Sequence, residues 1–330
     1  MATTGVQRAA PWSRVTSILT STNPAARIAP ATTRDESSLE VAHTSRPPGR
    51  RSRIISAWTT SKDSMAEQAK ILFAEAEENN LGHKAVSERW GRWHKCSLCE
   101  QDYHGAVYCA LGWACWKTYL GRPDTDWTRQ GAMSMLGNGL LAAESFTDAL
   151  PVYEAVLAMM RRLGASDDHM LAVQNNLAAT YQFLKRHEKA LSMYRQVYSA
   201  FVKLHGEDQP RSLDAANNYA VTLTQSNRYR EAKSLLRKLI PVVRRVLGDS
   251  NELTLQMRWN YAKALYEDTD ATLDDIREAV TTLEETERTA RRVLGGTHPT
   301  TEGIEDELRT ARAVLRAREA GKRVVFKFTT

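Results

Sequence analysis

Apolar residues recur at helical spacing along most of the chain that follows Met65. The segment at 64–80 places five apolar residues on one face of a helix: Ala66, Ala69, Leu72, Phe73 and Ala76. Ser64 has the side chain of an N-cap, and Glu67 three residues later completes a capping box. A turn rich in Gly, Pro and Asp follows at 121–126, and beyond it the pattern stays helical almost to the end. The pattern therefore predicts an all-α protein.

Two markers in the second half of the chain repeat with the same period. The segments NNLAATY, NNYAVTL and WNYAKAL begin at Asn175, Asn217 and Trp259, which are 42 residues apart. A second marker ends in glycine at Gly164, Gly206, Gly248 and Gly295. Its last interval is 47 residues, and the segment 268–275 accommodates the five extra residues. Two markers with one period indicate a helix–turn–helix unit that stacks on copies of itself.

Small residues occupy matching positions in the two helices of each predicted unit. The first helix carries Gly137, Ala178, Ala220 and Ala262, and the second carries Ala149, Ala190, Ala232 and Ala279. Four residues after each alanine of the second helix stand Tyr153, Tyr194, Leu236 and Leu283. Small side chains let two antiparallel helices cross closely, so we expect each pair to pack through these positions.

The repeated unit resembles the tetratricopeptide repeat in a longer form of about 42 residues. The segments around NNLA and the segment LGGTHPTT at 294–301 are similar to the repeats of kinesin light chains. The resemblance implies a right-handed α-α superhelical solenoid, with four repeats over 126–300. Residues 301–318 place Ile304, Leu308, Ala311 and Leu315 on one stripe, and we interpret them as a cap helix.

The same resemblance implies that the first helix of each repeat lines a concave groove. The groove position is then Asn176, Asn218 and Asn260, with Asn138 on the equivalent face of the first repeat. A ladder of amides can bind the backbone of an extended peptide, because each amide offers two donors and an acceptor. Lys263 would add a contact to an acidic or carboxylate group. The alternative interpretation is that these asparagines cap turns or bridge neighbouring repeats.

All four cysteines lie within the segment 95–116. Cys96, Cys99, His104 and Cys109 have the spacing of a zinc knuckle, which makes them a candidate structural zinc site. The competing interpretation is a helix from about Gly105 whose apolar face, formed by Val107, Ala110, Leu111 and Ala114, packs as an N-terminal cap with the thiols buried. The sequence leaves both interpretations open over the Cys-rich segment 61–125.

Two functions from different classes follow from these patterns. The first is a non-enzymatic scaffold that binds an extended peptide of another protein in the groove. The second is a zinc-knuckle protein that binds single-stranded RNA, with bases stacked on Tyr103, Tyr108 and Trp113 and the repeats as support. The sequence contains no Gly-rich phosphate loop, HExxH motif or nucleophile elbow, so we expect no enzyme activity.

The net charge of +6 on 330 residues is concentrated in one segment. Residues 1–60 carry eight arginines against three acidic residues, whereas the rest of the chain is nearly balanced, so nucleic acid is an unfavoured partner. We expect 1–60 to be a disordered basic tail or a transit peptide, and 319–330 to be a flexible tail. No apolar run is long enough for a membrane span. We therefore expect a cytoplasmic monomer, with import into a mitochondrion or plastid as the alternative.

Overall fold

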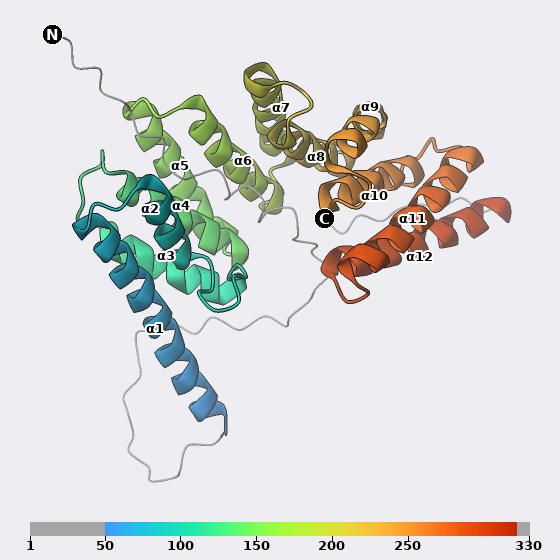
Figure 1. The fold of residues 1–330 in the computed structure, drawn as a ribbon. Coiled ribbons are helices and arrows are strands. Elements are labelled where there is room, and N and C mark those ends of the chain that lie inside the picture. The colour runs from blue at the N-terminus through green and yellow to red at the C-terminus, as the bar shows by residue number, and fades with distance from the viewer. Residues whose placement is uncertain (1–49, 322–330) are drawn as a thin grey trace. The chain divides into compact units, whose positions relative to one another are not determined.

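The computed structural model describes the backbone of residues 50–321 and the side chains of residues 64–321 (Figure 1). Within that range it contains twelve α-helices, one short 3-10 helix and no strand, which confirms the predicted all-α class. The expected tails at 1–60 and 319–330 lie outside the described residues except for 50–60 and 319–321, and residues 50–60 belong to a helix and not to a disordered tail. The described chain divides into two compact units, unit 1 up to Gly164 and unit 2 from Ala165.

Unit 1 contains the Cys-rich segment and the first predicted repeat. Its helices are α1 (Arg50–Glu78), α2 (His83–Trp90), the 3-10 helix η2 (Gly91–Trp93), α3 (Gly105–Tyr119), α4 (Trp127–Ala142) and α5 (Phe146–Arg162). The first helix begins at Arg50, so the predicted N-cap at Ser64 is wrong. No Pro or Gly interrupts residues 50–81, and the helix therefore continues through the capping signal.

Large aromatic side chains form the core of unit 1. Phe73 of α1 packs edge-on against Trp90, with ring centroids 5.2 Å apart, and Trp90 lies 5.0 Å from the ring of Trp127. Trp93 is fully buried and meets Tyr119 at 6.0 Å. Aromatic pairs of this kind contribute about 0.5–1.5 kcal/mol each beyond the area that they bury. The core therefore depends on a few large aromatic contacts that are not repeated elsewhere in the described part of the chain.

Helices α3 and α4 cross with their backbones in contact. A Cβ atom on Gly112 would lie 2.9 Å from the carbonyl oxygen of Met135, and one on Gly139 would lie 2.8 Å from the Cα atom of Cys109. This crossing sets which face of α3 is buried: Tyr108, Leu111, Gly112, Cys115 and Tyr119. The predicted face through Val107, Ala110 and Ala114 is wrong by about one residue, because apolar composition alone does not show where a partner backbone approaches.

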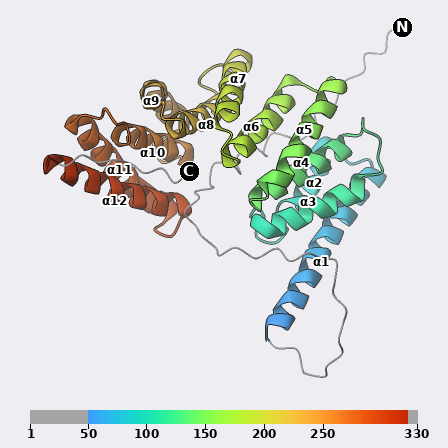
Figure 2. The same cartoon turned by 180° about the vertical axis from the view of Figure 1, so that it is seen from behind.

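Unit 2 consists of three helix pairs followed by one more helix, in sequence order in both views (Figures 1 and 2). The first helices are α6 (Asp167–Phe183), α8 (Pro210–Gln225), α10 (Glu252–Tyr266) and α12 (Pro299–Glu319). The second helices are α7 (His187–His205), α9 (Tyr229–Leu247) and α11 (Leu273–Leu294). The alanines predicted at the crossings are fully buried: Ala178, Ala190, Ala220, Ala232, Ala262 and Ala279.

The contacts among the helices of unit 2 give the array two unequal sides. Helix α8 contacts α10, and α10 contacts α12, whereas within 167–319 no comparable contact joins α7 to α9 or α9 to α11. The first helices therefore lie closer together than the second helices do. In a curved array of helix pairs, the more closely spaced helices lie on the inner side. We call the surface that carries Asn176, Asn218, Asn260 and Glu307 the inner face. Among residues 50–321, no helix has the length and apolar content that crossing a bilayer requires.

Candidate functional site

Asparagine pairs connect successive first helices along the inner face. The side-chain amide of Asn218 on α8 donates to Oδ1 of Asn175 on α6 at 3.3 Å. One repeat later, the amide of Asn260 on α10 donates to Oδ1 of Asn217 on α8 at 2.8 Å. The two acceptors are buried, and the two donors are half-buried. The second interpretation of the asparagines, as bridges between neighbouring repeats, therefore holds for Asn218 and Asn260.

The ladder continues into α12 with the direction of the hydrogen bond reversed. Trp259 takes the position that Asn175 and Asn217 hold in the earlier repeats, and its indole Nε1 donates to Oε2 of Glu307 at 2.9 Å. Glu307 stands 47 residues after Asn260, the interval of the last glycine marker. Glu307 was not among the residues predicted from the sequence, although this interval locates it.

Glu307 also receives two further donors from α10. The Nζ atom of Lys263 lies 3.2 Å from its carboxylate, and the hydroxyl of Tyr266 donates to it. Lys263 forms a second ion pair with Glu267 at 3.3 Å. Burial lowers the pKa of Lys263, but the charges of Glu307 and Glu267 outweigh it and the net shift is upward. Burial, followed by the charge of Glu307, raises the pKa of Tyr266.

The predicted groove residues differ in their exposure and in how many of their polar groups are already bonded within the protein. Asn218 and Asn260 each keep part of the side chain exposed. Asn176 is only 7 % exposed, and the charge of Lys263 is already compensated by two carboxylates. In unit 1, Asn138 accepts from the hydroxyl of Tyr153 at 2.6 Å. Asn218 and Asn260 are therefore the predicted contacts that remain best placed for a ligand.

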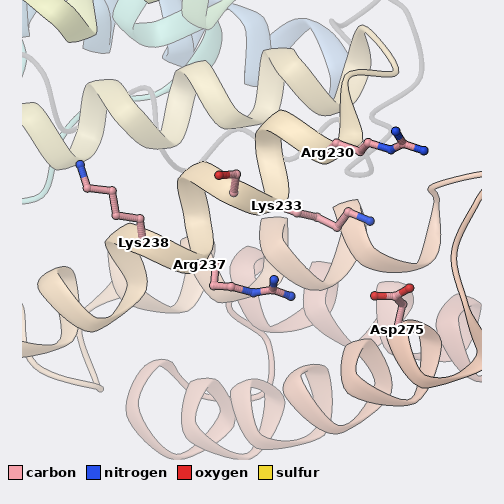
Figure 3. A pocket seen from close by; sticks show the side chains of 6 residues that line it. Arg230, Lys233, Arg237, Lys238 and Asp275 are labelled. Atoms are coloured by element: carbon pink, nitrogen blue, oxygen red, sulfur yellow. The ribbon is translucent and has the colours of Figure 1, made fainter.

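An open depression of about 480 Å³ lies between the second helices α9 and α11 (Figure 3). It is lined by Arg230, Lys233, Ser234, Arg237 and Lys238 of α9 and by Asp275 of α11. Helix α9 carries six basic residues and one acidic residue. The net charge summed over residues 61–330 is close to zero because acidic residues elsewhere offset this helix. That sum therefore did not reveal the basic helix.

Acidic and hydroxyl groups hold most of the basic side chains of the depression. Lys233 pairs with Asp268 at 2.7 Å, and Lys238 pairs with Glu207 at 2.6 Å. Arg237 donates to the hydroxyl of Tyr261 at 2.9 Å. These ion pairs and this hydrogen bond connect consecutive repeats. Because they compensate most of the positive charge, the depression is not a free anion-binding site.

A small polar cavity lies where α6, α7 and α8 meet. Asn175, Phe201, Arg211, Asp214 and Ala215 line it. Burial raises the pKa of Asp214 to about 7. Asp168 binds Arg211 and lies 2.7 Å from Nε2 of His205. Burial raises the pKa of Asp168, but the hydrogen bonds and charges of these two partners outweigh it and lower the pKa. This cavity is therefore lined by a carboxyl group whose pKa burial raises toward neutral pH.

The first two cysteines lie on a tight turn between η2 and α3. The amide of Glu100 donates to the carbonyl of Cys96 at 3.1 Å, and the amide of Cys96 donates to the carbonyl of Gln101 at 2.9 Å. An antiparallel bridge joins Lys95 to Asp102 at the base of the turn. Arg92 donates to the carbonyl of Cys96 at 3.1 Å and to Glu100 at 2.7 Å. The turn is therefore fixed on both sides.

The four cysteines occupy three different environments. The sulfur of Cys96 accepts from the amide of Leu98 at 3.4 Å. Hydrogen bonds from the backbone of Cys99 and then of Leu98 lower the pKa of Cys96. Burial raises the pKa of Cys109 and raises that of Cys115 more strongly. Cys115 is fully buried in the core, as the packed-thiol interpretation predicts for this residue.

The four predicted zinc ligands are not gathered into one group. Among residues 64–321, no cluster of three or more His, Cys, Asp or Glu side chains has the arrangement of a metal site. His104 lies at the N-cap of α3 and Cys109 lies within that helix, away from the turn that holds Cys96 and Cys99. The predicted base-stacking role of Tyr108 is wrong, because its ring is only 1 % exposed.

One family model matches part of the chain. The sequence model of the tetratricopeptide repeat matches residues 129–201 and 169–245. No curated protein matches the chain. A crystal structure described as a Podosopora anserina putative kinesin light chain with nearly identical TPR-like repeats is similar at 21% identity and a TM-score of 0.48, covering 60% of this chain and 91% of that one. BtubC (BKLC) from P. vanneervenii is similar at 15% identity and a TM-score of 0.45, covering 68% of this chain and 95% of that one.

Proposed function

We propose that this chain, whose residues 129–245 are tetratricopeptide repeats, is a non-enzymatic scaffold that binds an extended segment of another protein along the inner face of unit 2. The observation that supports the proposal best is the ladder in which Asn218 and Asn260 are each fixed by one hydrogen bond and remain half-exposed. Such side chains are positioned before a ligand arrives.

The chemistry of the amide suits a peptide backbone. Asn218 and Asn260 each use one amide donor within the ladder, which leaves a second N–H and the side-chain oxygen for a ligand. A peptide backbone offers alternating donors and acceptors, so it can bind these groups without a particular side-chain sequence. The ladder also restricts the rotamers of both asparagines, so less side-chain entropy is lost on binding.

A peptide display library tests the proposal without knowledge of the natural partner. Immobilised full-length protein would be used to select extended peptides, and the dissociation constant of each selected peptide would then be measured by titration. We expect the double variant Asn218→Ala with Asn260→Ala to weaken binding at least tenfold, because two backbone-binding groups are removed.

The control for this experiment is an amide on the outer side of the array. Gln196 on α7 is exposed, and within residues 64–321 its side chain bonds to Ser192 of the same helix, so Gln196→Ala should leave the dissociation constant unchanged. Circular dichroism must show that both variants keep the helical content of the wild type. Selected peptides that bind the double variant as tightly as the wild type would contradict the proposal.

A further inference from the structure

Cys96 and Cys99 lie on one tight turn, which the amide of Glu100 closes by donating to the carbonyl of Cys96 at 3.1 Å. The amide of Leu98 donates to the sulfur of Cys96 at 3.4 Å, and the thiol of Cys99 donates to Oε1 of Gln101 at 4.0 Å. The two residues are three positions apart in a tight turn, which brings their Cα atoms within about 7 Å. A disulfide requires a Cα separation of about 4.4–6.8 Å, so closing one needs little movement of the backbone.

The surroundings of this pair are those of a reactive thiol. Cys99 is exposed, and Leu98 at the tip of the turn is 93 % exposed, so a small molecule can reach the sulfurs. Arg92 and Lys95 flank the turn through their ion pairs with Glu100. The amide donor on the Cys96 sulfur favours a thiolate, which is the nucleophile in thiol–disulfide exchange.

The other two cysteines provide an internal contrast. Cys115 is fully buried, and Cys109 is half-buried with its backbone against Gly139 of α4. Neither is placed on an exposed turn beside a second thiol. Any difference in reactivity between the two pairs therefore reports on the local geometry and not on the general redox state of the sample.

We propose that Cys96 and Cys99 are a reversible redox pair, which a small disulfide such as oxidised glutathione converts into a disulfide across the 96–99 turn. In the first step, the Cys96 sulfur attacks one sulfur of the oxidised glutathione, and one glutathione leaves as a thiolate that takes up a proton. In the second step, the Cys99 sulfur loses its proton to solvent and attacks the sulfur of Cys96, which releases the second glutathione. The protein loses two protons and two electrons, and one oxidised glutathione takes them up to become two reduced ones.

Peptide mass mapping of the full chain tests this pairing. The protein would be reduced in the presence of a metal chelator, desalted and exposed to oxidised glutathione, and the remaining thiols would be alkylated before digestion. We expect one peptide that contains Cys96 joined to Cys99, while Cys109 and Cys115 are recovered as alkylated thiols. Dithiothreitol should return the linked peptide to its reduced form.

Single variants separate the pair from general oxidation. Cys99→Ser removes the resolving thiol, so a mixed disulfide with glutathione should accumulate on Cys96. Cys109→Ser should leave both the rate and the product unchanged. The proposal is overturned if Cys109 or Cys115 oxidises before the pair, if Cys96 and Cys99 stay reduced in the wild type, or if the wild type keeps a glutathione adduct that never closes.

Discussion

Unit 1 and unit 2 are both built from packed helices, but different kinds of contact hold them together. Unit 1 relies on a cluster of large rings around Phe73 and on one close helix crossing at Gly112 and Gly139. Unit 2 repeats the same alanine crossing three times and connects its first helices through a polar ladder. A unit made of unique contacts is sensitive at single positions, whereas a repeated unit distributes its stability among neighbouring interfaces.

The largest effect should come from adding one methyl group to the crossing of unit 1. We expect Gly139→Ala to lower the free energy of unfolding by about 2–3 kcal/mol, because the new Cβ meets the backbone of Cys109, which cannot rotate away. Urea denaturation followed by tryptophan fluorescence measures this unit well, since Trp90, Trp93 and Trp127 all belong to its core. Gly121→Ala is the control, because a Cβ there meets nothing within 4 Å. Equal costs for the two variants would show that the backbones are not in contact.

A smaller loss should follow when the end of the ladder in unit 2 is removed. We expect Glu307→Ala to cost about 1–2 kcal/mol, because the indole of Trp259 and the hydroxyl of Tyr266 lose their acceptor. Urea denaturation followed by circular dichroism gives the value. Glu305→Ala on the same helix breaks only an exposed pair with Arg291 and should cost less than about 0.5 kcal/mol. If the two variants cost the same, the network of Glu307 does not stabilise the last repeat.

The smallest effect concerns the pH dependence of unit 2. Because burial raises the pKa of Asp214 to about 7, the folded chain binds a proton more tightly there than the unfolded chain does. This contribution is fully present below the ordinary pKa of an aspartate and is lost as the pH rises to about 7. Asp214→Asn should therefore match the wild type at pH 4 and be more stable at pH 8 by about 1 kcal/mol, a value reduced because the residue is partly exposed.

Urea midpoints of the wild type, of Asp214→Asn and of Asp208→Asn at the two pH values test this sign. Asp208 is exposed beside the same helix, so its variant should follow the wild type at both pH values. If the urea midpoints of Asp214→Asn and the wild type differ more at pH 4 than at pH 8, the pKa of Asp214 is not raised.

The comparison of the units also explains what could be predicted from the sequence. In unit 2 each contact occurs several times, so a 42-residue period identified the buried alanines and the asparagine positions before any coordinates. In unit 1 the buried face of α3 depends on where α4 approaches Gly112, and that crossing has no second copy among residues 64–321. A single sequence therefore gave the helix but not its orientation.

The same reasoning applies to the candidate sites. Asn218 and Asn260 could be identified because the repeat marks their position, and Glu307 could have been identified from the final 47-residue interval. The spacing of the cysteines could not show whether Cys109 lies near Cys96. A loop through residues 96–109 would bring the two together, whereas a helix that begins at Gly105 separates them. The basic helix α9 was hidden by a charge balance taken over the whole folded part.

Photo-crosslinking of a selected peptide tests most directly whether the inner face of unit 2 is the binding surface. A photoreactive phenylalanine derivative would replace Thr310 or Val221, which stand three residues after Glu307 and Asn218 on the same helices, or Arg195 or Arg245 on the second helices. We predict that the peptide is captured from positions 310 and 221 and not from positions 195 and 245. Capture from the second helices alone would contradict the account, because it would place the ligand on the opposite side of the array.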